Sequence, residues 1–272
     1  MADTFSAEIR PGNVLDAASL EDVSEFFAAF YAPNNAVLTI AGDFEPDAAL
    51  KMVEKHFGQI PANPSIPKAP STAVDPIIGS EVREVVPDRV PLPRIYAAYR
   101  MPTFGTDGFN ALEVVVDLLG SGRASRLYRS LVREEQLAQD VTTFAFPVIG
   151  GAAIFTIWAT ARPGVRYERL ETALWGEVDR LAADGPSDDE LERVRNLHAA
   201  GVESSLERIS ERADRLSMYA CLFDEPERIN TEVSRYEAID AGRVREAMAG
   251  SIRPDNRLVL TYVPAESADG AV

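Results

Sequence analysis

The chain of 272 residues contains little cysteine and little histidine. Its one cysteine, Cys221, cannot form an internal disulfide, and its position among apolar residues predicts a buried structural thiol. The two histidines, His56 and His198, have no histidine partner at the spacing of zinc ligands, and no Gly-x-Ser-x-Gly motif accompanies them. We therefore expect no metal ligand and no catalytic residue in this chain.

Positive charge and long apolar runs are also scarce. The chain has 27 Lys and Arg against 43 Asp and Glu, which gives a formal net charge of −16. Nucleic acids and anionic membrane surfaces are polyanions, so neither is expected as the main partner. The longest apolar run, residues 150–161, is too short to cross a bilayer, and no membrane insertion is expected. The first ten residues lack the features of a signal peptide, and both a cytoplasmic and a periplasmic location stay open.

Proline, by contrast, is concentrated in one stretch. Eight of the 18 prolines lie between Pro61 and Pro93. Proline lacks an N–H and disfavours helix in the residue before it, so this stretch must be largely extended. We interpret residues 61–93 as a linker that leads into a strand over residues 81–86. It divides a short N-terminal part, residues 1–60, from a longer domain over residues 94–264, and residues 265–272 form a tail.

The N-terminal part predicts a helix, a strand and a second helix. Apolar residues recur at helical spacing from Leu20 to Tyr31, and Ser19 stands at the N-cap position. Residues 36–41 have the pattern of a buried strand, and Pro46 begins a helix that reaches residue 57. One strand and two helices cannot close a core, so residues 1–60 are predicted to be the C-terminal remnant of a domain.

The longer part predicts an α+β domain. Strands and helices are grouped without regular βαβ alternation, which favours a mainly antiparallel sheet with helices packed on one face. The predicted strands cover residues 94–101, 140–146, 152–161 and 257–263. The predicted helices cover residues 109–119, 124–135, 167–183, 191–207, 209–222, 226–238 and 241–249, and a capping box, Ser187 with Glu190, precedes the fourth of them.

A row of arginines in the second of these helices is the most unusual local feature. Steps of three, three and four residues place Arg123, Arg126, Arg129 and Arg133 along one face of an α-helix. One interpretation is a solvated face that pairs with nearby acids such as Glu134, because exposed ion pairs are common and weak. The other is a surface in a cleft that binds carboxylates or peptide backbone. The sequence leaves both open.

Two runs resemble the insulinase-like (M16) zinc metallopeptidases. The first is Tyr-Ala-Pro-Asn-Asn-Ala followed by Gly-Asp-Phe, within residues 31–44, and the second is Leu-Gly-Ser-Gly-Arg-Ala-Ser-Arg-Leu-Tyr from residue 119. The resemblance covers nearly the whole chain. It implies the C-terminal, non-zinc portion of such a peptidase: an M16/LuxS-like metallohydrolase type of domain, preceded by a partial αβα segment of a like domain.

The resemblance also implies a function and its partners. Members of the family hold zinc on an inverted His-x-x-Glu-His helix, and this motif is absent here. The chain would then be a non-catalytic half, inactive alone, that encloses peptide substrate together with a zinc-bearing half or subunit. Zinc is expected only in that complementary half. An inert scaffold subunit of a larger complex, a module that binds peptides at a sheet edge, and a homo-oligomer stay open as alternatives.

The candidate substrate-binding residues follow from the arginine row and from the resemblance. The family's second domain often supplies an Arg and a Tyr, seven positions apart, that contact substrate. This sequence has Val132 and Gln139 at those positions, although Arg133 is adjacent and Gln139 can still donate a hydrogen bond. The predicted substrate-binding residues are Arg126, Arg129, Arg133 and Gln139.

Overall fold

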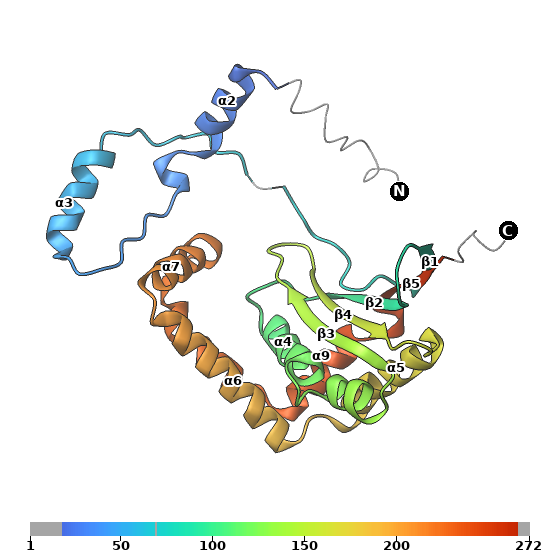
Figure 1. The fold of residues 1–272 in the computed structure, drawn as a ribbon. Helices are drawn as coiled ribbons and strands as arrows, with labels where there is room; N and C mark the ends of the chain where they lie inside the picture. Colours follow the sequence, from blue (N-terminus) through green and yellow to red (C-terminus); the bar gives the residue numbers. More distant parts are fainter. Residues whose placement is uncertain (1–17, 69, 266–272) are drawn as a thin grey trace. The chain divides into compact units, whose positions relative to one another are not determined.

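The computed structural model describes residues 18–68 and 70–265 (Figure 1). The chain divides into two compact units. The first unit combines the chain up to Pro70 with Ile209–Pro226, and the second combines Ser71–Arg208 with the chain from Glu227 onward. The domains predicted from the sequence differ from this division at residues 209–226, which they assigned to the C-terminal domain. Each unit is described by itself.

The described residues of the first unit form four helical segments: α2 (Leu20–Phe30), η1 (Pro33–Asn35), α3 (Pro46–Phe57) and α7 (Ile209–Phe223). Ser19 caps α2, as predicted, and the structure adds a capping box with Asp22. The prediction of a strand over residues 36–41 is wrong. A strand requires hydrogen bonds to a neighbouring backbone, and among the described residues all such strand pairs lie in the second unit. A hydrogen bond of 2.7 Å from Ser217 Oγ to Thr39 Oγ1 joins this segment to α7.

Most apolar side chains of the first unit face outward. No residue of α2 or α3 is buried. Phe26 and Phe27 are about half exposed, and Leu50 is 67% exposed. The buried residue of α7 is Tyr219, whereas Cys221 is exposed. The prediction of a buried thiol is therefore wrong, because residues two positions apart on a helix point to nearly opposite faces.

The second unit is built on a sheet of five strands in the order β1-β5-β2-β4-β3. The pairs β5-β2, β2-β4 and β4-β3 are antiparallel, so the predicted α+β fold with a mainly antiparallel sheet is confirmed. The parallel pairing of β1 with β5 was not predicted; it inserts the last strand between the first two. The strands are β1 (Val82–Asp88), β2 (Arg94–Met101), β3 (Ala138–Phe146), β4 (Ala153–Ala161) and β5 (Arg257–Pro264).

Helices of the second unit pack on one face of this sheet (Figure 1): α4, α5 and α9 contact its strands, and α6 and α8 pack on α4. Alternate residues of β2, from Ile95 to Met101, are buried against apolar residues of α4 such as Leu112 and Leu119. The predicted helix over residues 226–238 consists of two shorter pieces. The helical segments are α4 (Asp107–Gly120), α5 (Tyr167–Asp184), α6 (Asp188–Leu206), η3 (Pro226–Asn230), α8 (Glu232–Glu237), α9 (Ala241–Ser251) and η4 (Pro254–Asn256).

The helix predicted over residues 124–135 has a different geometry. Its main part, η2 (Tyr128–Glu134), is a π-helix, and Arg123 precedes the helical residues. The prediction that four arginines share one face of an α-helix is therefore wrong, because it assumed 3.6 residues per turn throughout. Among the described residues, no helix is long and apolar enough to cross a membrane.

The end of the proline-rich segment is fixed to the second unit by a buried asparagine. Asn256 is fully buried and accepts a hydrogen bond of 3.1 Å from the backbone N–H of Ile78. Its side-chain amide donates to the carbonyl oxygens of Arg100 and Ser251, each at 2.7 Å. One side chain thus joins the linker, β2 and the end of α9.

Candidate functional site

The face of the sheet opposite the helices carries a row of aromatic side chains. Tyr262 of β5, Tyr96 of β2, Trp158 of β4 and Phe144 of β3 follow one another across four strands. The ring centroids of successive members lie 5.8, 6.3 and 5.2 Å apart. The register explains the row, because Tyr96 lies opposite Trp158 and opposed residues point to the same face. We call these four residues the aromatic row.

A hollow of about 370 Å³ lies at one end of the aromatic row, and we call it the sheet-end hollow. All five strands contribute to it. The register places Arg94 opposite both Thr160 of β4 and Tyr262 of β5, so that these side chains meet at one end of the sheet. The lining residues are Asp88, Val90, Pro91, Leu92, Arg94, Tyr96, Gln139, Thr160 and Tyr262.

Gln139 reaches the sheet-end hollow through a β-bulge. Ala138 pairs with Ala161 and Asp140 pairs with Thr160, so Gln139 is an extra residue in β3. A bulge places two residues opposite one and redirects a side chain. Gln139 is exposed and lines the hollow, while Ala138 before it is buried in the core.

Arg94 is held in the hollow by its neighbours on three strands. Its Nε donates to Thr160 Oγ1 at 2.7 Å, its Nη1 donates to Tyr96 Oη at 3.4 Å, and its Nη2 lies 3.8 Å from Asp140 Oδ2. The hydrogen bond to Tyr96 raises the pKa of Arg94, although partial burial opposes this shift. The arginine side chain is 40% exposed and keeps its charge. It therefore presents a positioned cation to the hollow.

The three candidate arginines lie elsewhere. Arg126 donates through Nε and Nη2 to the two carboxylate oxygens of Glu190, at 2.8 and 2.7 Å, and through Nη2 to the carbonyl oxygen of Gly185 at 2.9 Å. This arginine lowers the pKa of Glu190 to about 2. Arg129 is half exposed, with its Nε 4.0 Å from a carboxylate oxygen of Glu134, and Arg133 is exposed.

Of the four predicted substrate-binding residues, Gln139 alone lines the sheet-end hollow. The sequence interpretation missed Arg94 and Tyr96, which it assigned to a strand without a role. The signal was the alternation Arg-Ile-Tyr-Ala at the start of β2, since residues two apart on a strand share a face. Ile95 and Ala97 are buried in the core, so Arg94 and Tyr96 point to the other side.

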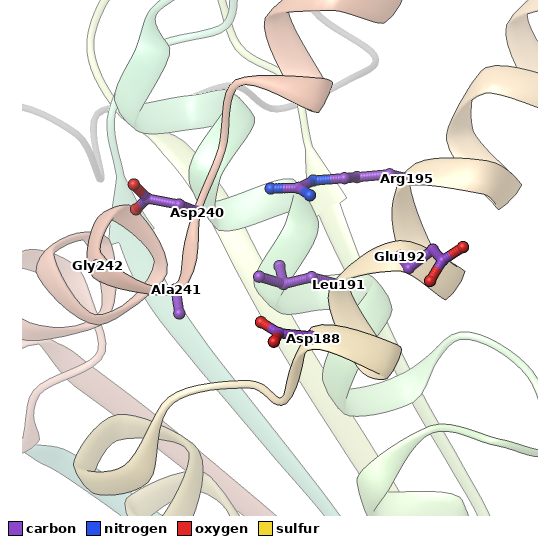
Figure 2. A pocket seen from close by; sticks show the side chains of 7 residues that line it. All are labelled: Asp188, Leu191, Glu192, Arg195, Asp240, Ala241 and Gly242. Carbon is purple, nitrogen blue, oxygen red and sulfur yellow. The ribbon is translucent and has the colours of Figure 1, made fainter.

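A second hollow, of about 530 Å³, lies between α6 and the start of α9. Figure 2 shows Arg195 extending from α6 toward this start, while Glu192 points away. The polar groups here serve the helix ends: Arg195 donates to the carbonyl oxygen of Ile239, and Asp240 accepts from the backbone N–H of Arg243 at 2.8 Å. This capping bond is the main cause of the lowered pKa of Asp240. Arg195 and Asp240 thus stabilise the chain at the start of α9.

Metal ligands do not converge anywhere in residues 18–68 and 70–265. No group of three or more His, Cys, Asp or Glu side chains in this part of the chain is arranged to hold a metal ion. The chemistry that the sheet-end hollow offers is binding by hydrogen bonds, charge and aromatic contact.

A match to a protein-family profile shows to which family the chain belongs. The profile described as "Peptidase M16 inactive domain" matches residues 17–197, more than half of the chain. The chain belongs to the M16 peptidase family. Its match is to the inactive domain of that family, and the predicted membership is confirmed.

Similar proteins agree with this membership. The M16 chain is 25% identical over 203 residues to the zinc protease PqqE of Helicobacter pylori, covering 74% of this chain and 45% of that protein. It is 24% identical over 204 residues to an uncharacterized zinc protease of Mycobacterium tuberculosis, covering 75% of this chain and 45% of that protein. The chain thus spans less than half the length of these curated relatives.

Solved structures share the fold. The crystal structure of a protease from Helicobacter pylori superposes with a TM-score of 0.78 at 20% identity, over 92% of this chain and 60% of that one. The M16 inactive domain from Pseudomonas fluorescens superposes with a TM-score of 0.75 at 16% identity, over 92% of this chain and 58% of that one. At these identities the likeness concerns the fold alone.

Proposed function

We propose that the chain is the non-catalytic half of an M16 zinc peptidase and forms one wall of a chamber that encloses peptide substrate. The carrying observation is the aromatic row, which leads across four strands into the sheet-end hollow. An extended peptide can lay apolar side chains on the aromatic rings and direct carbonyl oxygens to the amide donors of Gln139. Membership in the M16 family supports a peptide as the ligand.

The proposed partner is a zinc-bearing half, on the same polypeptide or another, that packs on the first unit. In the first unit of this chain, α2 and α3 expose large apolar side chains. A hollow of about 640 Å³ beside α3 is lined almost wholly by apolar residues such as Leu38, Met52 and Phe57. Apolar patches of this kind mark surfaces that another protein covers. Zinc would be held by the partner and would activate the water that attacks the peptide.

The test begins with peptide binding to the chain alone. The chain has two tryptophans, and Trp158 lies within the aromatic row, so a Trp175→Phe variant has a single fluorophore at the proposed site. Titration with a blocked, unstructured ten-residue peptide of Gly, Ser and Phe should change the emission of Trp158 saturably. A Trp158→Phe variant that retains Trp175 serves as the matched control and should show no change.

Two results would overturn the proposal. Cleavage of a quenched fluorogenic peptide by the chain and zinc ions, abolished by a chelator, would refute a non-catalytic half. Absence of any Trp158 response up to millimolar peptide would favour the alternative of an inert scaffold subunit. For the partner surface, Phe27→Glu should abolish co-purification with the zinc-bearing half, and Glu21→Gln on the same helix should not.

A further inference from the structure

We propose that Arg94 makes the sheet-end hollow a binding site for a carboxylate, which it recognises on an acidic side chain or at the free C-terminus of the peptide. This inference rests on the proposed function and names the chemical group that the site selects. Arg94 lies outside the residues that the sequence patterns indicated, and it enters the site only because five strands converge at one end of the sheet.

Arg94 retains hydrogen-bonding capacity for a ligand. A guanidinium group has five N–H donors, and here one is taken by Thr160 at 2.7 Å and a second forms a long bond of 3.4 Å to Tyr96. The ion pair with Asp140, at 3.8 Å, is longer than a hydrogen bond, and both side chains are about 40% exposed. Exposed pairs of this kind contribute little, so a carboxylate bound by two parallel hydrogen bonds can displace Asp140.

The surroundings of Arg94 complete a site for a carboxylate. The bond from Nε to Thr160 fixes the plane of the guanidinium, which lowers the entropy lost when a ligand binds. Tyr96 accepts from Arg94 and keeps its own hydroxyl hydrogen for a ligand oxygen, and the exposed amide of Gln139 adds further donors. Arg94 is the one Lys or Arg among the described residues that line the hollow.

Charge supplies the selectivity. The chain has a net charge of −16, which opposes the long-range approach of anionic ligands at low ionic strength. Arg94 is a positioned cation in the sheet-end hollow, so a carboxylate gains binding free energy mainly by contact with this side chain. Asp88, on the β1 side of the hollow, limits this gain and disfavours ligands that approach without reaching Arg94.

The experiment compares three probe peptides on the full-length Trp175→Phe chain. All are the ten-residue Gly/Ser/Phe peptide: one carries an internal Asp with blocked ends, one carries Asn instead with blocked ends, and one carries Asn with a free C-terminal carboxylate. The Asp probe or the free-carboxylate probe should bind at least tenfold more tightly than the blocked Asn probe. Which of the two does so identifies the source of the carboxylate.

Substitutions then assign the effect to Arg94. Arg94→Gln should remove the tenfold preference and leave the blocked Asn probe bound as before, which also shows that the site is folded. Arg94→Lys should retain part of the preference, because the charge remains and the planar pair of donors is lost. Arg129→Gln, on an exposed arginine outside the hollow, is the matched control and should change nothing.

The outcomes separate this inference from the proposed function. If all three probes bind equally, or if Arg94→Gln weakens all of them alike, the carboxylate site is refuted and peptide binding stands. If no probe changes the emission of Trp158, the proposed function fails and this inference fails with it.

Discussion

The ion pair between Arg126 and Glu190 should be a large local contribution to the stability of the second unit. Two short hydrogen bonds join the guanidinium to both carboxylate oxygens, and the side chains are only 14% and 16% exposed. Charged hydrogen bonds each contribute about 1.5–3 kcal/mol, and a mostly buried charge left without its partner adds a penalty. Arg126→Met should therefore lower the free energy of unfolding by about 3 kcal/mol.

A double-mutant cycle measures the pair itself. Arg126→Met, Glu190→Gln and the double variant are unfolded with urea and followed by tryptophan emission, which reports on the second unit because Trp158 and Trp175 both lie there. The coupling free energy should be about 2 kcal/mol. Arg129→Met is the control and should cost less than about 0.5 kcal/mol, because that side chain is half exposed and 4.0 Å from its acid.

The coupling should also depend on pH. The folded-state pKa of Glu190, about 2, lies below its ordinary value of 4.5, so the pair's contribution is fully present above pH 4.5 and is lost as the pH falls toward 2. A coupling below 0.5 kcal/mol at pH 7, or one unchanged between pH 6 and pH 3, would refute this reasoning. It would also revive the interpretation of Arg126 as a residue free to bind substrate.

Three further predictions concern the same unit and use the same unfolding assay. Gly120→Ala should destabilise the second unit by about 1–3 kcal/mol, because the new Cβ would lie 2.1 Å from Thr143 Oγ1. The control Gly176→Ala places its Cβ in open space and should stabilise the unit by up to about 1 kcal/mol. Equal effects of the two substitutions would contradict this reasoning. Burial raises the pKa of Glu113 from 4.5 to about 7. The protonated carboxyl of Glu113 therefore favours the folded state fully below pH 4.5, and this contribution is lost as the pH rises through 7. Glu113→Gln should raise the free energy of unfolding by up to about 3 kcal/mol above pH 7 and change it little at pH 4. Asn256→Ala should cost about 3 kcal/mol because it leaves buried backbone groups without partners, and a cost below about 1 kcal/mol would show that water replaces the side chain.

Local patterns predicted much of the fold because their causes are local. The N-cap at Ser19 and the capping box at Ser187 depend on residues within one helical turn, and both are present in the structure. The strand predicted over residues 94–101 coincides with β2, whose alternate residues are buried as the two-residue period of a strand requires. Family membership also followed from short runs of sequence, and the family profile confirms it.

Predictions that assumed a regular element or a missing neighbour were wrong. The arginine row assumed an α-helix, and the chain forms a π-helix over Tyr128–Glu134. The strand over residues 36–41 assumed a partner backbone that the described residues do not provide. Both predictions rested on sequence periodicity, which reports only the local conformational preference of a segment. The conformation that forms also depends on contacts with the rest of the chain.

By itself, the sequence determined the α+β class, the mainly antiparallel sheet and the likeness to the M16 family, and it pointed to Gln139. Only the tertiary structure decided that Arg94, Tyr96, Gln139, Thr160 and Tyr262 share one hollow. These residues are separated along the chain, and β-strand register together with one bulge brings them side by side. Register is a long-range property, because it depends on which backbones pair, and no local pattern specifies that pairing.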